Sequence, residues 1–284
     1  MDAAGIRPTV TAAVMVKNHR QFIRGCLEML RWADEVLILN DESTDGTIDL
    51  ARQYPNVRVF DHPLGNNWSR QRNVGLDQAR GEWVFQVDVD HRISAELAAE
   101  IRAAAKDKEK AVFTANIWSV VLGAIFPDTG ARDLWPALVR RGRGRWTEIN
   151  QTHAHMEFDG PIGHLKEHIV HLGPHAGSIM DFFKKNSFFA ETEALTNITR
   201  RENIPPRSGP AILWWFLVKP FLIFLHKYYT GYRRMGMAGF HFAMLRAIGY
   251  YMVYLRTWEL EYVERGRNDM FEYCKKRGLP LFLD

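Results

Sequence analysis

The sequence predicts an α/β protein in which a mostly parallel sheet with helices on both faces precedes a helical C-terminal extension. Short apolar runs alternate with segments whose apolar residues recur at helical spacing, which is typical of strand–helix–strand units. The composition then changes at a proline-rich break over residues 205–210. We therefore predict a sheet domain over residues 1–204 and a helical extension over residues 205–284.

The predicted strands are apolar runs that stop at polar residues. The first four predicted strands cover residues 11–16, 35–40, 57–60 and 83–91. A helix signal follows each of the first three: helical spacing from residue 22, Ser and Thr capping residues within 41–47, and a helical stretch over about 69–79. Further along the chain we predict a helix over 94–110, a strand over 111–122 and a helix over 178–197.

Size and composition indicate a globular protein. With 284 residues, 46% hydrophobic and 25% charged, the chain is able to bury a sizeable core. Its net charge of +4 suits an anionic substrate or a membrane surface as well as nucleic acid. Cys26 and Cys274 lack metal-binding spacing, which indicates a reducing compartment. Residues 1–11 carry no signal-peptide pattern, so we expect a cytosolic location.

The most informative stretch is the run from Trp83 to His91, which ends in two carboxylates. Alternation along a strand places Asp88 and Asp90 on the same face. A hard divalent cation would balance these two like charges, since Mg²⁺ and Mn²⁺ bind carboxylate oxygens together with substrate phosphates. The alternative is a solvated turn in which the two aspartates only cap the following segment.

Polar residues also follow two other predicted strands. Lys17 and Asn18 follow the first strand, and Asn40 and Asp41 stand at the end of the second. Ligands of parallel α/β sheets bind beyond the carboxyl ends of the strands. We therefore expect these residues to share one rim of the sheet with Asp88 and its neighbours.

The order of these motifs resembles a known family. The segment Asn40 to Thr47 is similar to the Asp-x-Gly-Ser-Thr-Asp-Gly-Thr element of inverting family 2 glycosyltransferases with the GT-A (Rossmann-like) fold. Residues 68–73 and 79–83 match the segment that leads into the Asp-x-Asp strand of that family. The chain most resembles the lipopolysaccharide-core β-1,4-glucosyltransferase group, over nearly its whole length. It departs at Asn40, where many relatives have Asp, and at His91, where they often have Glu.

The resemblance implies a nucleotide-sugar donor and a Mg²⁺ or Mn²⁺ ion. Asn40 and Asp41 would contact the base or ribose, with Lys17 nearby, and Arg72 would approach the diphosphate. Asp88 would lie near the ribose or the metal, and Asp90 would bind the metal. The cation would neutralise charge on the leaving nucleoside diphosphate. The alternatives are an ordered Ser-Thr turn for Asn40 and Asp41 and an exposed helix arginine for Arg72.

The same resemblance implies an acceptor region around residues 132–141. There Arg140 and Arg141 would contact an acceptor phosphate, unless they belong to a solvated basic loop.

The resemblance also directs attention to a histidine-rich segment. An inverting transferase needs a general base for the acceptor hydroxyl. Relatives carry His-Glu shortly before Asp-Gly, and alignment on Asp159-Gly160 places His153 on the His and Ala154 on the Glu. Since the expected carboxylate is missing, His155 and Glu157 are the candidate replacements. A structural zinc site is the alternative, although no Cys partner or His-Glu-x-x-His helix accompanies these histidines.

The extension is rich in apolar and aromatic residues. Residues 211–225 are interrupted by Lys219 and Pro220 and are shorter than the roughly 20 residues of a membrane span. Aromatic residues and arginines then intermingle over 228–254, which is typical of helices in the headgroup region. We predict a membrane-associating extension; packing on the sheet domain or on a dimer partner is the alternative.

Together these features predict inverting transfer of a hexose or heptose from a nucleotide diphosphate sugar to a hydroxyl of a lipid-linked saccharide. The enzyme would be peripheral (monotopic) on the cytoplasmic face of the inner membrane. Transfer to a polyprenyl phosphate is the first alternative, because an anionic acceptor needs no strong base. An inactive membrane-bound scaffold is the second. The basic residues form no stripe with a nucleic-acid motif, so no nucleic-acid partner is expected.

Overall fold

The computed structural model describes residues 7–65, 67–121, 123–127, 134–148, 155–173, 179–264, 273 and 275–277. The chain forms two compact units. The first comprises residues 1–120 and 125–173, and the second comprises residues 121–124 and 174–284. The domain boundary at residue 205 stays a prediction. The helix that precedes this residue, within 174–204, packs as part of the second unit. Each unit is described by itself.

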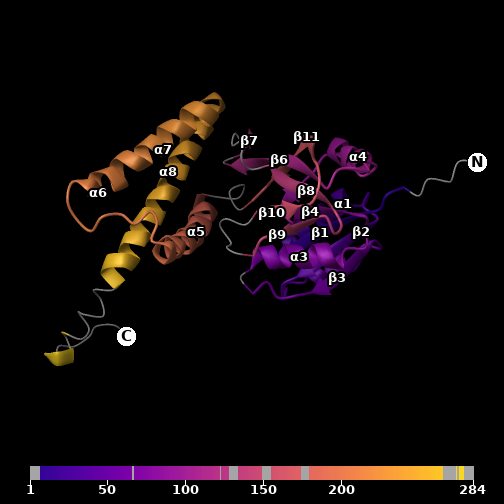
Figure 1. Cartoon of the computed structure of the whole chain (residues 1–284), viewed down its shortest axis with the longest axis horizontal. Helices are drawn as coiled ribbons and strands as arrows, with labels where there is room; N and C mark the ends of the chain where they lie inside the picture. The colour runs from indigo at the N-terminus through magenta and orange to yellow at the C-terminus, as the bar shows by residue number, and fades with distance from the viewer. Residues whose placement is uncertain are drawn as a thin grey trace, which may run out of the picture. The chain divides into compact units, whose positions relative to one another are not determined.

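The first unit begins with four parallel strands in the order β3-β2-β1-β4 (Figure 1). Val16 pairs with Asn40, and Met15 pairs with Asp88, so the polar strand ends lie at one edge. The connections between these strands are helical, as parallel strands require. The elements are β1 (Val10–Val16), α1 (Arg20–Met29), β2 (Glu35–Asn40), α2 (Thr47–Ala51), β3 (Val57–Asp61), α3 (Trp68–Gln78) and β4 (Trp83–Asp88).

Beyond β4 the sheet becomes mixed and continues in the order β8-β6-β11-β5. β8 is antiparallel to both β4 and β6, whereas β11 is parallel to β6 and antiparallel to β5. The prediction of a mostly parallel sheet therefore describes the first four strands best. The further elements are β5 (His91–Arg92), α4 (Ala95–Ala104), β6 (Val112–Val121), β7 (Ala124–Pro127), β8 (Trp135–Arg140), β9 (Gly144–Trp146), β10 (Met156–Phe158) and β11 (Ile162–His171). β9 and β10 form a separate two-stranded sheet.

Helices cover both faces of the main sheet, as predicted. Ile23 of α1 and Leu97 of α4 pack with Phe85 in the larger core cluster. Leu76 of α3 packs with Val84 on the other face. Because alternate residues of a strand face opposite sides, the odd-numbered residues of β4 face α1 and α4, and the even-numbered residues face α3.

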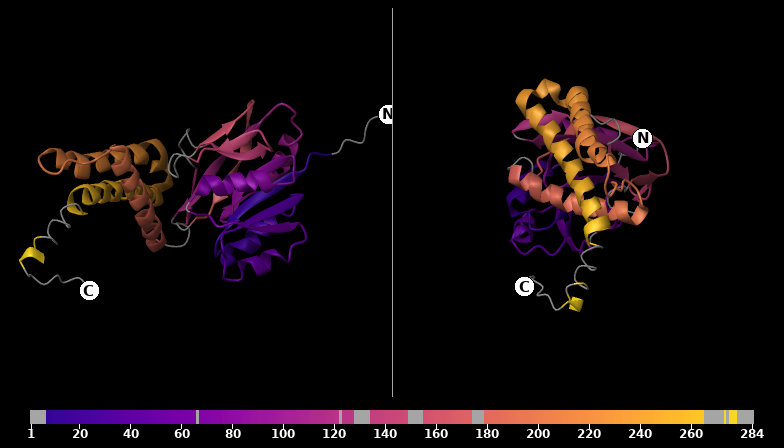
Figure 2. Two further views of the ribbon diagram at one scale, coloured as in Figure 1. Left: turned by 60° about the horizontal axis from the view of Figure 1, so that its bottom comes forward. Right: turned by 90° about the vertical axis from the view of Figure 1, so that its left-hand side faces the viewer.

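The second unit is helical. α5 (Ile179–Arg200) packs on α8 (Gly236–Trp258), where Asn197 Nδ2 donates to Thr257 Oγ1 at 3.3 Å. A continuous helical arm precedes α8 and packs beside it (Figure 2). This arm consists of α6 (Ala211–Leu213), the π-turn η2 (Trp214–Val218), α7 (Lys219–Lys227) and the π-turn η3 (Tyr228–Tyr232). The short 3₁₀ turn η4 (Arg233–Met235) joins the arm to α8, and the π-turn η5 (Glu259–Glu264) follows α8.

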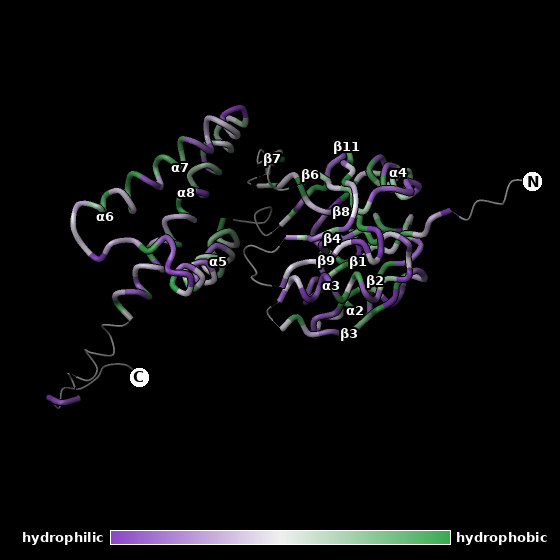
Figure 3. The backbone as a smooth tube through the Cα atoms, viewed as in Figure 1, coloured by the Kyte–Doolittle hydropathy of each residue, from purple (hydrophilic) through white to green (hydrophobic). Residues whose placement is uncertain are grey.

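Two glycines permit the turn between the helical arms. Gly236 has φ 58°, a left-handed value that favours glycine. A Cβ on Gly239 would lie 1.9 Å from the carbonyl oxygen of Tyr232, so only glycine fits there. Hydrophobic residues (green in Figure 3) recur along both arms. By length and composition alone, the stretch Ala211–Val263 is apolar enough to cross a membrane.

Candidate active site at the carboxyl edge of the sheet

The side-chain alternation of β4 determines where Asp88 lies. Phe85 and Val87 face the larger core, so Gln86 and Asp88 face α3. Arg72 of α3 approaches from that side, with Nη2 3.7 Å from Asp88 Oδ2. The structure therefore brings together two residues that the resemblance assigned to the donor site.

Two tryptophans enclose the Arg72 guanidinium. Its Cζ lies 4.8 Å from the ring centroid of Trp135 and 5.2 Å from that of Trp146. Gln86 holds both rings in place: Trp146 Nε1 donates to Gln86 Oε1 at 2.8 Å, and Trp135 Nε1 donates to the Gln86 carbonyl at 3.2 Å. Since the Arg72 side chain is only 17% exposed, it acts as a fixed positive charge beside Asp88.

Asp90 lies beside a histidine from a distant strand. Nε2 of His171, the last residue of β11, is 3.2 Å from Asp90 Oδ2. His91 directly follows Asp90 in the sequence, and its ring meets that of His171 edge-on, with the ring centroids 5.2 Å apart. Potential ligand atoms of Asp90, His91 and His171 all lie within 4.8 Å of one another.

His91 itself is better suited to support than to ligation. The backbone N–H of Asp88 donates to His91 Nδ1 at 3.1 Å, which occupies the lone pair of that nitrogen. Burial lowers the pKa of His91, so the ring is neutral and carries its proton on Nε2. This hydrogen bond closes the turn from Asp88 to His91, which carries both aspartates.

The remaining donor set fits a divalent cation. Asp90 supplies a carboxylate oxygen, His171 an imidazole nitrogen, and Asp88 a second carboxylate at the same edge. Mg²⁺ prefers oxygen ligands, whereas a set that includes a histidine also suits Mn²⁺. The residues present therefore fit the metal that the sequence predicted.

Lys17 and Asp41 also meet at this edge. Lys17 Nζ is 2.9 Å from Asp41 Oδ2, and the Leu64 N–H donates to Asp41 Oδ1 at 2.9 Å. Burial alone would raise the pKa of Asp41, but the Leu64 amide and the Lys17 ammonium outweigh it and hold this pKa below its usual value. Asp41 is therefore an anion with a fixed orientation.

Asn40 has a structural explanation for its departure from the family pattern. Its Nδ2 donates to Asp61 Oδ1 at 2.7 Å, and its Oδ1 accepts the Ser43 N–H at 3.0 Å. An aspartate at this position would place two carboxylates in contact. Asn40 thus orders the Ser-Thr turn and ties β2 to Asp61 at the end of β3.

Arg140 and Arg141 lie at the opposite end of β4. Arg140 pairs with Trp83, the first residue of that strand, and its Nη1 contacts Glu82 Oε1 at 3.0 Å. Its guanidinium also covers the Trp83 ring at 4.5 Å. The Arg141 N–H donates to the Glu82 carbonyl at 2.9 Å. The structure does not bring these predicted acceptor residues to the edge that carries Asp88.

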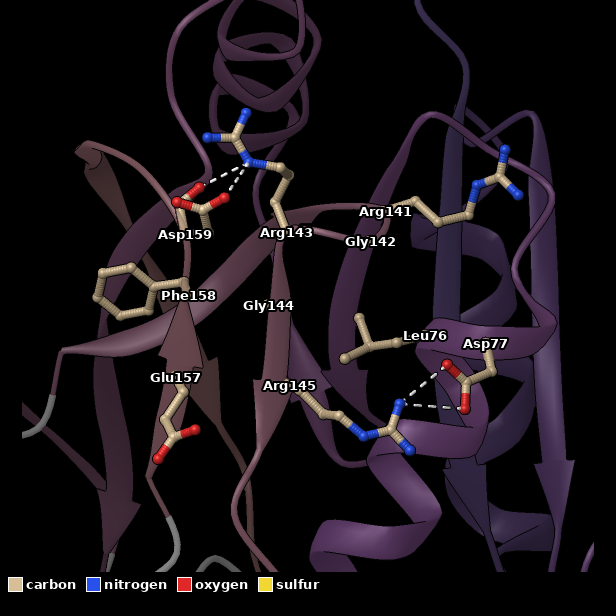
Figure 4. Close-up of a pocket in the computed structure, with 10 residues that line it drawn as sticks. All are labelled: Leu76, Asp77, Arg141, Gly142, Arg143, Gly144, Arg145, Glu157, Phe158 and Asp159. Atoms are coloured by element: carbon tan, nitrogen blue, oxygen red, sulfur yellow. Dashed lines mark hydrogen bonds and ion pairs between the residues drawn. The ribbon is translucent and has the colours of Figure 1, made fainter.

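Glu157 and Arg141 line a cavity of about 520 Å³ beside the end of α3 (Figure 4). In it Arg145 pairs with Asp77, and Arg143 lies near Asp159. Glu157 is opposite Arg145 in the β9–β10 pair and 76% exposed. Met156, next to Glu157 in β10, and its cross-strand partner Trp146 are buried on the other face, where Trp146 contacts Arg72. Glu157 therefore points away from the Arg72 side.

His155 lies near Glu157 and is also exposed. Its Nε2 is 3.9 Å from Glu157 Oε1, and its backbone carbonyl accepts the Thr147 N–H at 2.9 Å. His153 and Ala154 lie outside the described residues. The assignment of a base to this stretch stays a prediction.

Comparison with known proteins gives the class of the chain. Residues 11–155, just over half of the sequence, match the family model of glycosyl transferase family 2. The chain therefore belongs to glycosyltransferase family 2. This membership, with the strand order of the first unit, confirms the predicted family and the GT-A class of α/β fold.

Among curated relatives, the chain is similar to the lipopolysaccharide core biosynthesis glycosyltransferase LpsC of Rhizobium meliloti, with 25% identity over 84% of this chain and 88% of LpsC. It is 31% identical to the putative glycosyltransferase EpsH of Bacillus subtilis over 43% of this chain and 36% of EpsH. Among solved structures, S. aureus TarS 1–349 has a TM-score of 0.48 at 17% identity over 89% of this chain and 91% of TarS. The Pyrobaculum calidifontis mannosyltransferase PcManGT, solved with GDP-Man and Mn²⁺, has a TM-score of 0.48 at 16% identity over 90% and 87%.

Proposed function

We propose that this chain transfers a sugar, with inversion, from a nucleotide diphosphate sugar to a hydroxyl of a lipid-linked saccharide. The observation that carries this proposal is the contact of Asp90 with His171, next to Asp88 at the sheet edge where Lys17 meets Asp41. Membership of family 2 and the similarity to LpsC support it. The enzyme would act at the cytoplasmic face of the inner membrane, to which it would be attached peripherally.

Each residue has a role in binding the donor. Asp41, with Lys17, recognises the ribose or base, and Asn40 holds the turn that presents them. Asp90 and His171 hold Mn²⁺ or Mg²⁺. Asp88, at the same sheet edge, contacts the ribose or the metal. The cation supplies neutralisation of the charge that develops on the leaving diphosphate. Arg72 holds the Asp88 carboxylate in its orientation and adds positive potential behind the diphosphate.

A second candidate function is transfer to a polyprenyl phosphate. It is favoured by the outward orientation of Glu157, since an acceptor that is already an anion needs no general base. Arg140 does not favour this candidate, because its guanidinium is engaged by Glu82 and by the Lys110 carbonyl.

A screen of nucleotide sugars distinguishes these candidates from an inactive scaffold. The full chain is incubated with UDP-, GDP- and ADP-linked sugars in Mn²⁺ or Mg²⁺, and thermal stabilisation is measured, because a ligand that binds only the folded state raises its stability. Donors that stabilise the chain are then tested for transfer to glycolipid and to polyprenyl phosphate. Transfer to the glycolipid supports the first function. No donor binding and no transfer in either metal would contradict both.

A further inference from the structure

We infer that the outer face of the helical hairpin, residues 211–258, is a docking surface for a bilayer that contains anionic lipid, and that both arms lie along this bilayer without crossing it. The inference concerns binding alone, and its test does not require the transfer reaction. The membrane was expected from composition; the structure identifies the face, its orientation and the charge of its partner.

The first arm presents a row of large apolar side chains to solvent. They recur as neighbouring pairs every four residues. The π-turn η2 keeps successive pairs in line along the arm. Leu217 is 62% exposed and Phe221 is 57% exposed. Contiguous apolar surface of this kind marks an interaction site in a folded protein. The row consists of Leu213, Trp214, Leu217, Val218, Phe221 and Leu222.

The second arm presents a matching stripe along α8. Its members recur at intervals of three, four and seven residues, which places them on one side of a helix. Met237, at the start, is 69% exposed. The stripe consists of Met237, Phe240, Met244, Tyr251 and Leu255.

Aromatic contacts hold the α8 stripe against the first arm. Phe240 meets Phe224 with ring centroids 5.3 Å apart, and Tyr251 meets Phe216 at 5.7 Å. Each contact pairs a member of the α8 stripe with a half-buried residue of the first arm that is not itself in the exposed row. The contacts therefore hold the two apolar stripes on one packed hairpin.

The position of Arg246 argues that the hairpin lies flat. Arg246 is exposed in the middle of α8, nine residues after Met237, so at about 100° per residue it is on the opposite side from the stripe. A hairpin that crossed the bilayer would place this arginine in hydrocarbon, which is costly. A hairpin that lies on the surface keeps it in water while the stripe is buried.

The charge of the hairpin identifies the partner. From Ala211 to Trp258 there is no Asp or Glu, and the cationic residues there are Lys219, Lys227, Arg233, Arg234, Arg246 and Arg256. Arg233 and Arg234 are exposed at the turn between the arms. A second copy of this face would bring like charges together, whereas anionic headgroups complement them. Lipid, and not a second copy, is therefore the occupant that fits.

The test is vesicle co-sedimentation of the full chain with phosphatidylcholine alone and with added phosphatidylglycerol. We expect tighter binding to the anionic vesicles. Leu217→Glu with Phe221→Glu should weaken that binding at least tenfold, and Arg233→Gln with Arg234→Gln should abolish the preference for anionic lipid. Arg246→Gln is the matched control, because it removes a charge from the opposite side and should change binding less than twofold. Circular dichroism checks the fold of each variant.

Three results would overturn the inference. The first is unchanged binding in the Leu217 and Phe221 double variant. The second is resistance of the bound chain to alkaline carbonate, which extracts surface-bound proteins but leaves spanning ones in place. The third is a lipid-free dimer in sedimentation that the same double variant dissociates while vesicle binding persists, since a second copy would then be the occupant.

Discussion

His171 Nε2 lies 3.2 Å from Asp90 Oδ2, although 81 residues separate the two in the sequence. The antiparallel pairing of β11 with β5 creates this contact, because it aligns His171 with His91, the residue next to Asp90. The proposed metal site is therefore assembled from the turn after β4 and the last residue of β11. Neither segment contains the site alone.

Replacement of His171 by Ala should weaken metal-dependent donor binding by at least about tenfold, because it removes the imidazole ligand. Calorimetric titration of Mn²⁺ in the presence of the nucleoside diphosphate measures this. His168→Ala is the control, since His168 is on the same strand but stacks on Trp118 at 3.6 Å. Equal losses in the two variants would count against His171 as a ligand.

Replacement of Arg72 by Lys should lower donor affinity about tenfold, although the charge is kept. An ammonium does not stack between Trp135 and Trp146 as the planar guanidinium does, so Asp88 loses its fixed partner. Arg70→Lys is the control two residues away on α3, where an exposed arginine pairs with Glu148. Donor affinity that is the same in both variants would show that the enclosure of Arg72 has no functional role.

Replacement of Asn40 by Asp, the residue common in relatives, should destabilise this chain by about 1–3 kcal/mol near neutral pH. The new carboxylate would be buried, as Asn40 is, and would face the exposed Asp61, and this repulsion would raise the folded-state pKa of the introduced carboxyl. Because protonation of one carboxyl relieves the repulsion, the penalty should shrink as the pH falls towards about 4. Urea unfolding at both pH values measures it, and the additional change Asp61→Asn should restore stability. A pH-independent loss would contradict this explanation.

Replacement of Glu157 by Gln should leave turnover within about threefold, since this side chain points away from the Arg72 side. A general base would instead cost about 10² to 10⁴-fold. His155→Ala should behave similarly. Steady-state transfer with saturating donor measures both variants, and a large loss in Glu157→Gln with preserved donor affinity would restore Glu157 as the base.

Much of the first unit was predictable because its signals are local. Apolar runs, turn residues and the Asp-x-Asp spacing all lie within short windows, and the structure has the first three strands where these windows place them. The fourth strand ends at Asp88, three residues earlier than predicted, so Asp90 lies in a turn and does not share a strand face with Asp88. The mixed half was harder, since antiparallel insertion of β8 between β4 and β6 depends on long-range pairing.

The enclosure of Arg72 was not predicted for the same reason. Trp135, Trp146 and Gln86 meet only after β8 and β9 have folded beside β4, with Gln86 and Trp146 60 residues apart. Asn73 adds a further link, because its side chain bonds both the N–H and the carbonyl of Trp146. Locally, the sequence shows only two tryptophans at the ends of the arginine-rich segment 135–146. Family resemblance likewise suggested Arg140 as an acceptor contact, but β8 carries it to the far end of β4.

The most direct test of the proposed function compares the wild-type chain with Asp90→Ala, with Mn²⁺ and with excess chelator. Asp90 lies in the turn after β4, so its removal takes away a ligand without opening a core cavity. We predict that the wild-type chain transfers sugar from its donor only with the metal present, and that Asp90→Ala remains folded but loses both metal-dependent donor binding and transfer. Full transfer by the wild-type chain in excess chelator, or by Asp90→Ala in Mn²⁺, would contradict the proposed metal-dependent mechanism.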